Sequence, residues 1–214
     1  MSMRTLVITA ISAASIILTS ACGSDPIRRD SPTALETAQD VELERYAGLW
    51  YEIAKFPNRF QKDCSQTTAT YTLRDDGLIS VLNQCVTEDG KIKKAKGKAR
   101  VAEPNAPSKL QVKFFPLAPW GDYWVLILDE DYQYSVVGDS EGRYLWILSR
   151  EPSMEEPLYR SLVDRLLAMG YFVDFLERTN HPPIPTAAEA AGKEKLKLWA
   201  GALLKNTLLA ENSE

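Results

Sequence analysis

Histidine and cysteine are scarce in this sequence, which contains one histidine and three cysteines among its 214 residues. Cys64, Cys85 and the distant His181 do not supply the ligand set of a zinc site, so we expect neither a metal nor another cofactor. An excess of positive charge is also missing, because the formal net charge is −4. Since no stripe of basic residues interleaves with aromatic ones, the composition argues against a nucleic-acid partner.

A lysine-rich stretch nevertheless occurs at Lys91–Arg100. On a strand, its lysines mostly alternate with small or apolar residues, which is typical of the solvated outer face or edge of a sheet. We therefore interpret this stretch as an exposed structural segment.

The apolar run Leu6–Leu18 is shorter than the roughly 20 residues that a transmembrane helix needs. It follows Arg4 and precedes the small residues Ser20 and Ala21, which is the pattern of an export signal. Residues 1–21 are therefore expected to be a signal peptide. Residues 22–40 are polar and contain two prolines, so we expect a flexible tether there.

Leu18–Cys22 resembles the bacterial lipobox, whose cysteine becomes lipidated. The resemblance implies an acyl anchor on Cys22, with palmitate as one such acyl group, and hence membrane attachment without a spanning helix. Gly23 stands where an aspartate would resemble the signal for inner-membrane retention. We therefore expect the outer membrane, with the protein facing the periplasm. The alternative is an ordinary signal peptide that is cleaved nearby.

Short apolar and β-branched runs, separated by turn residues, fill the chain from residue 41 to residue 175. We expect strands near Leu49–Phe56, Gln66–Arg74, Leu78–Val86, Lys93–Val101, Lys109–Phe115, Tyr123–Leu128, Tyr134–Gly138 and Tyr144–Ser149. Eight strands at fairly even spacing favour a barrel or a sandwich over a parallel sheet. Between Ser153 and Gly170, apolar residues recur at helical spacing and predict one helix.

Four motifs, in order along the chain, resemble the signatures of the lipocalin family, and in particular the bacterial lipocalins and apolipoprotein D. The first motif is GLWYEIAKFPNRFQK at Gly48–Lys62, which contains Gly48 and Trp50, and the second is ATYTLRDDGLISVLN at Ala69–Asn83. The third is LDEDYQYSVV at Leu128–Val137, which contains Asp129 and Tyr132. The fourth is YLWILSREP at Tyr144–Pro152, which contains Arg150. The resemblance implies an all-β fold over residues 41–178. This fold is an eight-stranded up-and-down antiparallel barrel with the C-terminal α-helix packed outside.

In such a barrel, the first strand starts and the last strand ends at the same, closed end. Trp50 and Arg150 then meet in a cation–π contact, which makes both residues structural. With Trp50 facing inward, the two-residue period of a strand places every second residue after it in the lumen. Tyr71 and Asn83 match positions that contact ligand in related lipocalins. The expected ligand-binding residues are Glu52, Ala54, Phe56, Tyr71, Asn83 and Trp146.

At the open end, Pro57–Cys64 is expected to cross the mouth of the barrel as a lid. The strand directions implied by the resemblance bring Cys64 and Cys85 to the same rim, and export permits a disulfide between them. Two unpaired thiols are the alternative. Phe114–Trp124 also reaches the mouth, where its apolar residues could admit lipid, touch a membrane or form a homodimer.

Residues 179–214 extend beyond the usual end of the family and are expected to be helical. Leu196, Trp199 and Leu203 can share one helical face, with lysines nearby. This extension could lie on a membrane surface, pack on the barrel or cover its mouth.

The resemblance implies a lipid-binding protein and not an enzyme. Its apolar, aromatic lumen with a few polar groups suits fatty acids or lysophospholipids, held for storage or transport in cell-envelope maintenance. One alternative is acid–base catalysis by Glu52 and Tyr71. Another is an interaction protein that acts through its C-terminal helix. A Ser–His or Cys–His pair is not expected, because His181 falls outside the barrel.

Overall fold

The computed structural model describes residues 25–31 and 33–182. Its elements are α1 (Leu43–Tyr46), β1 (Gly48–Lys55), β2 (Cys64–Leu73), β3 (Ile79–Thr87), β4 (Ile92–Glu103), β5 (Ala106–Lys113), β6 (Gly121–Leu128), β7 (Tyr134–Gly138), β8 (Leu145–Ser149), α2 (Glu156–Ala168), the 3₁₀ helix η1 (Val173–Phe175) and β9 (Glu177–Arg178). Strands β1 to β8 lie within a few residues of their expected places. The short helix α1 and the strand β9 were not expected.

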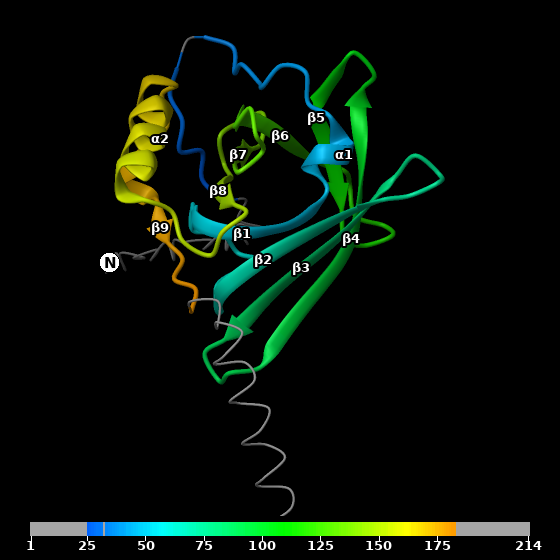
Figure 1. The fold of residues 1–214 in the computed structure, drawn as a ribbon, viewed down its shortest axis with the longest axis horizontal. Helices are drawn as coiled ribbons and strands as arrows, with labels where there is room; N and C mark the ends of the chain where they lie inside the picture. The colour runs from blue at the N-terminus through cyan, green and yellow to red at the C-terminus, as the bar shows by residue number, and fades with distance from the viewer. Residues whose placement is uncertain (1–24, 32, 183–214) are drawn as a thin grey trace, which may run out of the picture.

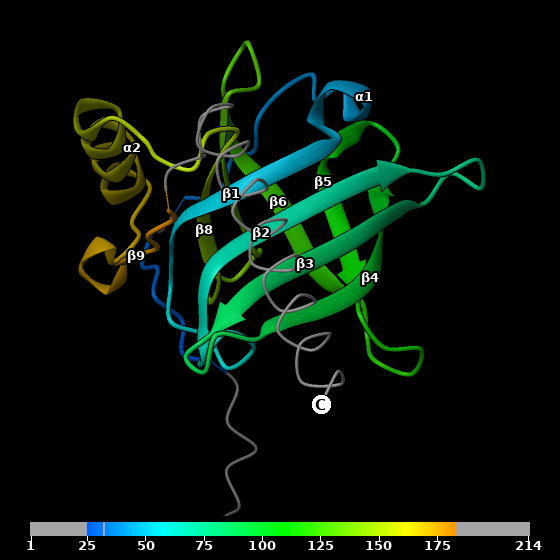
Figure 2. The same ribbon diagram turned by 60° about the horizontal axis from the view of Figure 1, so that its bottom comes forward.

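Strands β1 to β8 close into one antiparallel barrel, as the sequence predicts. Neighbouring strands pair in sequence order from β2 to β8, and β1 pairs with both β8 and β2. Closure satisfies backbone groups that an open sheet would leave unpaired at its edges. The helix α1 lies at one end of the barrel, and the β3–β4 hairpin extends at the other (Figures 1 and 2). We call the first the closed end and the second the mouth.

The helix α2 packs on the outer surface of the barrel (Figure 1), which confirms the expected position of the C-terminal helix. Its Leu162 and Leu166 are fully buried against the outward-facing Leu145 and Ile147 of β8. Each fully buried aliphatic side chain contributes about 1.5–3 kcal/mol to stability. The barrel therefore has two apolar clusters, one in the lumen and an outer one beneath α2.

A β-bulge in β1 changes which side chains face the lumen. Between Glu52 and Ala54 the pairing with β8 shifts, so that Ile53 is an extra residue. Trp50 belongs to the lumen cluster, whereas Ala54 and Phe56 belong to the outer cluster. The expectation that Ala54 and Phe56 line the lumen is therefore wrong. One extra residue moves the two-residue period by one position and turns the following side chains outward.

Arg150 and α1 together cover the closed end. The guanidinium carbon of Arg150 lies 3.7 Å from the ring centre of Trp50, which confirms the predicted cation–π contact. The same guanidinium donates hydrogen bonds to the carbonyl oxygens of Arg45, Tyr46, Ala47, Leu49 and Tyr132. Gly48 has a φ of +99°, and a Cβ there would lie 3.3 Å from Arg150 Nη1. Glycine thus lets the chain pass beneath the guanidinium in a conformation that other residues rarely adopt.

The turn between β6 and β7 is the third family motif, and it also serves the closed end. Asp129 Oδ2 accepts a hydrogen bond from the Gln133 N–H at 3.1 Å. Tyr132 has a φ of +59°, and its hydroxyl accepts a hydrogen bond from the Glu42 N–H at 2.9 Å. Asp129 therefore closes the turn, and Tyr132 holds it against the segment that leads into α1.

The segment before α1 lies along the outside of the barrel. The backbone N–H groups of Arg28, Asp30 and Ala38 donate hydrogen bonds to the β7–β8 turn, the end of α2 and β6. This attachment differs from the flexible tether expected over residues 22–40. The expected signal peptide, Cys22 and the extension from residue 183 onward lie outside the described residues. In the part of the chain that the structure describes, no helix has the length and apolar character to span a membrane.

Candidate functional site

Three tyrosines fill the floor of the lumen near the closed end. Tyr123 Oη lies 2.9 Å from both Tyr46 Oη and Tyr71 Oη. Burial raises the pKa of all three phenols, so they remain neutral at physiological pH. The cavity left between the tyrosines and the neighbouring apolar side chains measures about 10 Å³. Such a cavity has room for about one water molecule, so a larger ligand has to lie above the floor.

The mouth half of the lumen is more open and is lined by small residues. Ala69, Asn83 and Ala95 pair across β2, β3 and β4 on the inward face. Ala69 and Asn83 are half-buried and Ala95 is exposed, so this wall is accessible from the mouth. Gly97 packs so closely on Phe114 that an added Cβ would lie 2.8 Å from the ring. We call this inward-facing wall of small side chains, with Phe114 packed on Gly97, the lumen slot.

Asn83 supplies an unpaired polar atom to the lumen slot. Its Oδ1 is buried and has no hydrogen-bond partner among the described residues. A buried acceptor without a partner costs about 1–3 kcal/mol, so a ligand that donates a hydrogen bond to it would gain affinity. The next residue, Gln84, faces the outer side of the sheet because side chains alternate along a strand.

The loop between β1 and β2 inserts the side chain of Gln61 into the mouth. Gln61 Oε1 accepts hydrogen bonds from Trp146 Nε1 at 2.9 Å and from Asn58 Nδ2 at 2.8 Å. Gln61 Nε2 donates to Glu52 Oε2 at 2.5 Å. The lid is thus joined to two of the predicted ligand-binding residues, Glu52 and Trp146. Sequence reasoning missed Gln61, because the sequence of a loop does not reveal which side chain turns inward.

Glu52 is a buried carboxyl group at the mouth, with 2% of its surface exposed. Besides the hydrogen bond from Gln61, it accepts one from Thr179 Oγ1 at 2.7 Å. Burial raises the pKa of Glu52 above its ordinary value of 4.5, while the hydrogen bonds from Thr179 and Gln61 and the charge of Lys55 oppose this rise. Glu52 therefore keeps its proton to a higher pH than a solvated carboxyl group would.

The strand β9 and the residues after it fill a gap in the barrel wall. β1 pairs with β2 only over Gly48–Tyr51, and beyond this point β9 pairs with β1 instead. The Thr179 N–H donates to the Ile53 carbonyl, and His181 Nε2 donates to the Glu52 carbonyl at 2.8 Å. The ring of His181 also meets Tyr51 edge-on. These contacts give His181 a structural position in the wall, and sequence reasoning missed both it and Thr179 as neighbours of Glu52.

The predicted pairing of Cys64 with Cys85 is confirmed, and the disulfide joins the start of β2 to the end of β3. A register shift between Ser65 and Thr68 brings the two Cα atoms to 5.4 Å. The bond closes a loop over a sequence separation of 21 at the mouth. In the chain-entropy account, a loop of this length contributes roughly 3 kcal/mol to stability.

Joint replacement Cys64→Ser and Cys85→Ser is expected to lower the free energy of unfolding by about 3 kcal/mol. Urea unfolding followed by tryptophan fluorescence measures this loss. Cys22→Ser is the matched control, because it removes a thiol without breaking the disulfide. A double variant as stable as this control would contradict the assigned contribution of the bond.

Glu52→Gln tests the buried carboxyl group through the pH dependence of stability. Burial raises the pKa of Glu52 in the folded state above its pKa in the unfolded chain. Between these two pKa values, the folded protein therefore binds more protons than the unfolded chain. Stability therefore falls as pH rises through this window, and the variant lacks this effect. We expect the wild type to lose stability relative to Glu52→Gln as pH rises from about 4.5, measured by urea unfolding at a series of pH values. A difference that stays constant with pH would show that the folded state leaves Glu52 unperturbed.

The remaining predicted site residues lie at different depths in the barrel. Glu52 and Trp146 meet through Gln61 at the mouth, whereas the hydroxyl of Tyr71 is bound to Tyr123 at the floor. The structure therefore does not assemble the acid–base pair of Glu52 and Tyr71. Among the described residues, no group of three or more His, Cys, Asp and Glu side chains could hold a metal ion.

Comparison with known proteins identifies relatives of this chain. A lipocalin-like domain family matches residues 41–181. Temperature-induced lipocalin-1 of Arabidopsis thaliana is 42% identical over 173 residues, which cover 77% of this chain and 92% of the plant protein. Outer membrane lipoprotein Blc of Citrobacter freundii is 34% identical over 178 residues, which cover 82% of this chain and 96% of Blc. Apolipoprotein D of Mus musculus is 33% identical over 155 residues, which cover 69% and 80% of the two chains.

The fold has a counterpart among solved structures. Insecticyanin of the tobacco hornworm Manduca sexta superposes with a TM-score of 0.60 at 20% identity, over 74% of this chain and 90% of insecticyanin. This likeness supports the barrel architecture alone. The domain match and the three relatives go further, because they cover most of the sequence that forms the barrel. The chain belongs to the lipocalin family.

Proposed function

We propose that the barrel binds one amphiphilic lipid, a fatty acid or a lysophospholipid, and stores or transports it during maintenance of the cell envelope. Binding of a small hydrophobic ligand is what the lipocalin relatives indicate. The observation that carries the proposal is the lumen slot, where the short side chains of Ala69 and Ala95 face the lumen above a packed floor and Ala95 stays exposed. The slot would take the acyl chain. Burial of about eight methylene groups contributes roughly 6 kcal/mol before the costs of binding.

The polar groups near the mouth suit the head group of such a lipid. Asn83 Oδ1 can accept a hydrogen bond from a glycerol hydroxyl or from a protonated carboxyl group. Trp146 and Gln61 can exchange their mutual hydrogen bond for one with the ligand when the lid moves.

Aromatic rings lead from the rim into the lumen. The ring centres of Phe60 and Tyr144 lie 5.7 Å apart, and Tyr144 stacks on Trp146 at 5.9 Å. Phe60 is exposed on the lid, and Trp146 faces the lumen. This path offers an acyl chain continuous apolar contact as it enters.

We further propose that Cys22 is lipidated and that the protein lies at the outer membrane, facing the periplasm. Two observations support this location. Leu18–Cys22 resembles a lipobox, and the Blc relatives of Citrobacter freundii and Escherichia coli are named outer membrane lipoproteins. The mass of the mature chain tests the anchor, because an ordinary signal peptide would leave Cys22 unmodified or removed.

Displacement of a fluorescent fatty acid tests ligand binding. We expect palmitate or lysophosphatidylethanolamine to displace the probe from one site per barrel. Asn83→Ala should weaken binding about fivefold, because it removes one hydrogen bond worth about 1 kcal/mol. Gln84→Ala is the matched control on the outer face of the same strand, and it should bind normally. Equal affinities in the two variants would contradict the role of Asn83, and failure of every amphiphile to displace the probe would contradict the proposed function.

The two other functions considered from the sequence gain no support from the described contacts. Glu52 and Tyr71 are held by different partners, so the enzyme alternative lacks its acid–base pair. An interaction role for the C-terminal helix concerns residues outside the described part of the chain. Deletion of the residues after His181 separates the functions, because loss of envelope function with intact ligand binding would favour the interaction role.

A further inference from the structure

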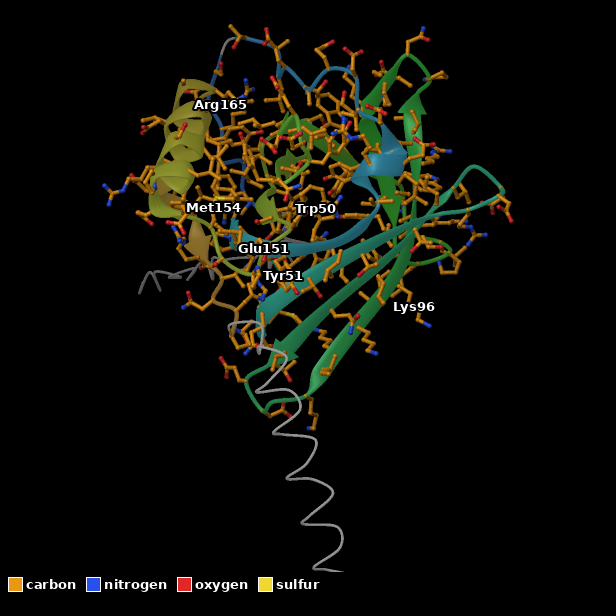
Figure 3. The ribbon with its side chains drawn as sticks, viewed as in Figure 1. Trp50, Tyr51, Lys96, Glu151, Met154 and Arg165 are labelled. Carbon is orange, nitrogen blue, oxygen red and sulfur yellow. A yellow bond between two sulfur atoms is a disulfide. The ribbon has the colours of Figure 1, made fainter. Side chains whose placement is uncertain are left out.

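The outer face of β4 carries a row of positive charges. Ala99 of this strand faces the lumen cluster. Because side chains alternate along a strand, the even-numbered residues on either side of Ala99 face outward. These residues, which we call the basic row, are Lys94, Lys96, Lys98 and Arg100. Figure 3 shows Lys96 pointing away from the barrel, on the side opposite Arg165 of α2. Successive members of the row lie about 6.7 Å apart along a strand, so their charges repel one another.

Three cationic side chains converge on one indole ring beside this row. Arg100 Cζ lies 4.3 Å from the ring centre of Trp120, and Lys98 Nζ and Lys113 Nζ lie 5.9 Å and 5.7 Å from it. Lys113 of β5 stands directly opposite Lys98 of β4, an arrangement of like charges that destabilises a sheet. Within residues 25–31 and 33–182, no carboxylate forms an ion pair with Lys113 or with the basic row. This surface therefore offers an uncompensated positive field in a chain whose net charge is negative.

The loop that carries Trp120 also exposes two large apolar side chains. Phe115 is 72% exposed and Leu117 is 99% exposed, and both follow closely on Lys113. Exposed apolar tips, an indole and a group of cations are the three parts of a surface that binds a lipid bilayer. The apolar tips enter the acyl region, the indole suits the interface, and the cations meet lipid phosphates.

We propose that Lys113, Trp120, Phe115, Leu117 and the basic row form a docking surface for an anionic phospholipid bilayer. The positive charge of this surface attracts the negative charge of the lipid head groups, which favours a bilayer of anionic phospholipids as the partner. β5 runs towards the mouth and β6 returns from it, so the tip residues belong to the mouth end of the barrel. Docking would hold the mouth at the membrane surface, an orientation that an acyl group on Cys22 alone does not set. The inference goes beyond the proposed ligand and does not depend on it.

A fluorophore placed at the loop tip tests this docking. Leu117→Cys in the full chain with Cys22→Ser carries a single reactive thiol, because Cys64 and Cys85 form the disulfide. An environment-sensitive dye at this position should shift to the blue with vesicles of phosphatidylcholine and phosphatidylglycerol, and not with phosphatidylcholine alone. The matched reporter is Leu167→Cys on α2, which is also exposed and should not respond. Because the readout is local, contact of the N-terminal segment with the vesicles does not mimic the result.

Charge variants distinguish the contribution of the basic row to vesicle binding from that of positive charge elsewhere on the protein. Lys96→Gln with Lys98→Gln should weaken binding to the anionic vesicles on the order of 20-fold, given the usual contribution of a basic residue near such a surface. Arg160→Gln with Arg165→Gln removes the same charge from α2 and should leave binding unchanged. Three outcomes would overturn the proposal: no blue shift at residue 117, an equal shift with neutral vesicles, or equal weakening by both pairs of substitutions.

Discussion

Trp50→Ala should lower the free energy of unfolding by about 3–5 kcal/mol, the range for truncating a buried tryptophan. Trp50 is fully buried in the lumen cluster, and its Nε1 donates a hydrogen bond to the Tyr46 carbonyl at 2.8 Å. Its ring also covers the guanidinium of Arg150. Truncation would leave a cavity and uncover a charge that ties α1 to the barrel.

Urea unfolding of the variant beside Leu49→Ala measures this effect. Leu49 is the preceding residue on the same strand, but 42% of its surface is exposed, so its truncation should cost less than about 1 kcal/mol. Similar losses in the two variants would contradict the assignment of Trp50 as the main side chain of the closed end.

Ala95→Trp should weaken the binding of a fluorescent fatty acid on the order of 100-fold while the barrel stays folded. Ala95 faces the lumen slot opposite Asn83 and is exposed, so an indole can enter the slot without displacing core side chains. If the indole takes the place of about four methylene groups of the ligand, the binding free energy falls by roughly 3 kcal/mol, because these groups are no longer buried.

The matched control is Lys96→Trp, which adds the same indole one position further along β4. Lys96 points away from the barrel (Figure 3), so this variant should bind the fatty acid as the wild type does. Unfolding midpoints of both variants show whether either indole disturbs the fold. Normal binding by a folded Ala95→Trp variant would place the ligand outside the lumen slot.

The strands could be predicted because short-range patterns specify them, whereas the barrel, its closed end and the disulfide were implied by the resemblance to lipocalins. Turn residues between alternating runs mark the strands, and the strand directions then determine which ends meet. The contact of Trp50 with Arg150 and the bond between Cys64 and Cys85 follow from those directions once a barrel is assumed. Tyr71 and Asn83 face inward for the same reason.

The failures have equally specific causes. Ala54 and Phe56 face outward because of the extra residue Ile53, and the sequence gives no sign of a bulge when both faces of the strand are buried. Gln61 and Thr179 reach Glu52 from segments 9 and 127 residues away in the chain, which no local pattern reveals. The polar residues before α1 look like a linker because their partners, such as the Met169 carbonyl that accepts from Arg29 Nε, lie far away in the chain.

Native mass spectrometry of the full chain extracted from membranes tests the central claim that the lumen holds a lipid. We expect one non-covalent adduct per barrel with the mass of a fatty acid or a lysophospholipid, separate from any covalent mass on Cys22. Ala95→Trp, prepared in parallel, should lack the adduct. Barrels that carry no lipid, or an adduct that persists in Ala95→Trp, would show that the lumen is not the lipid site.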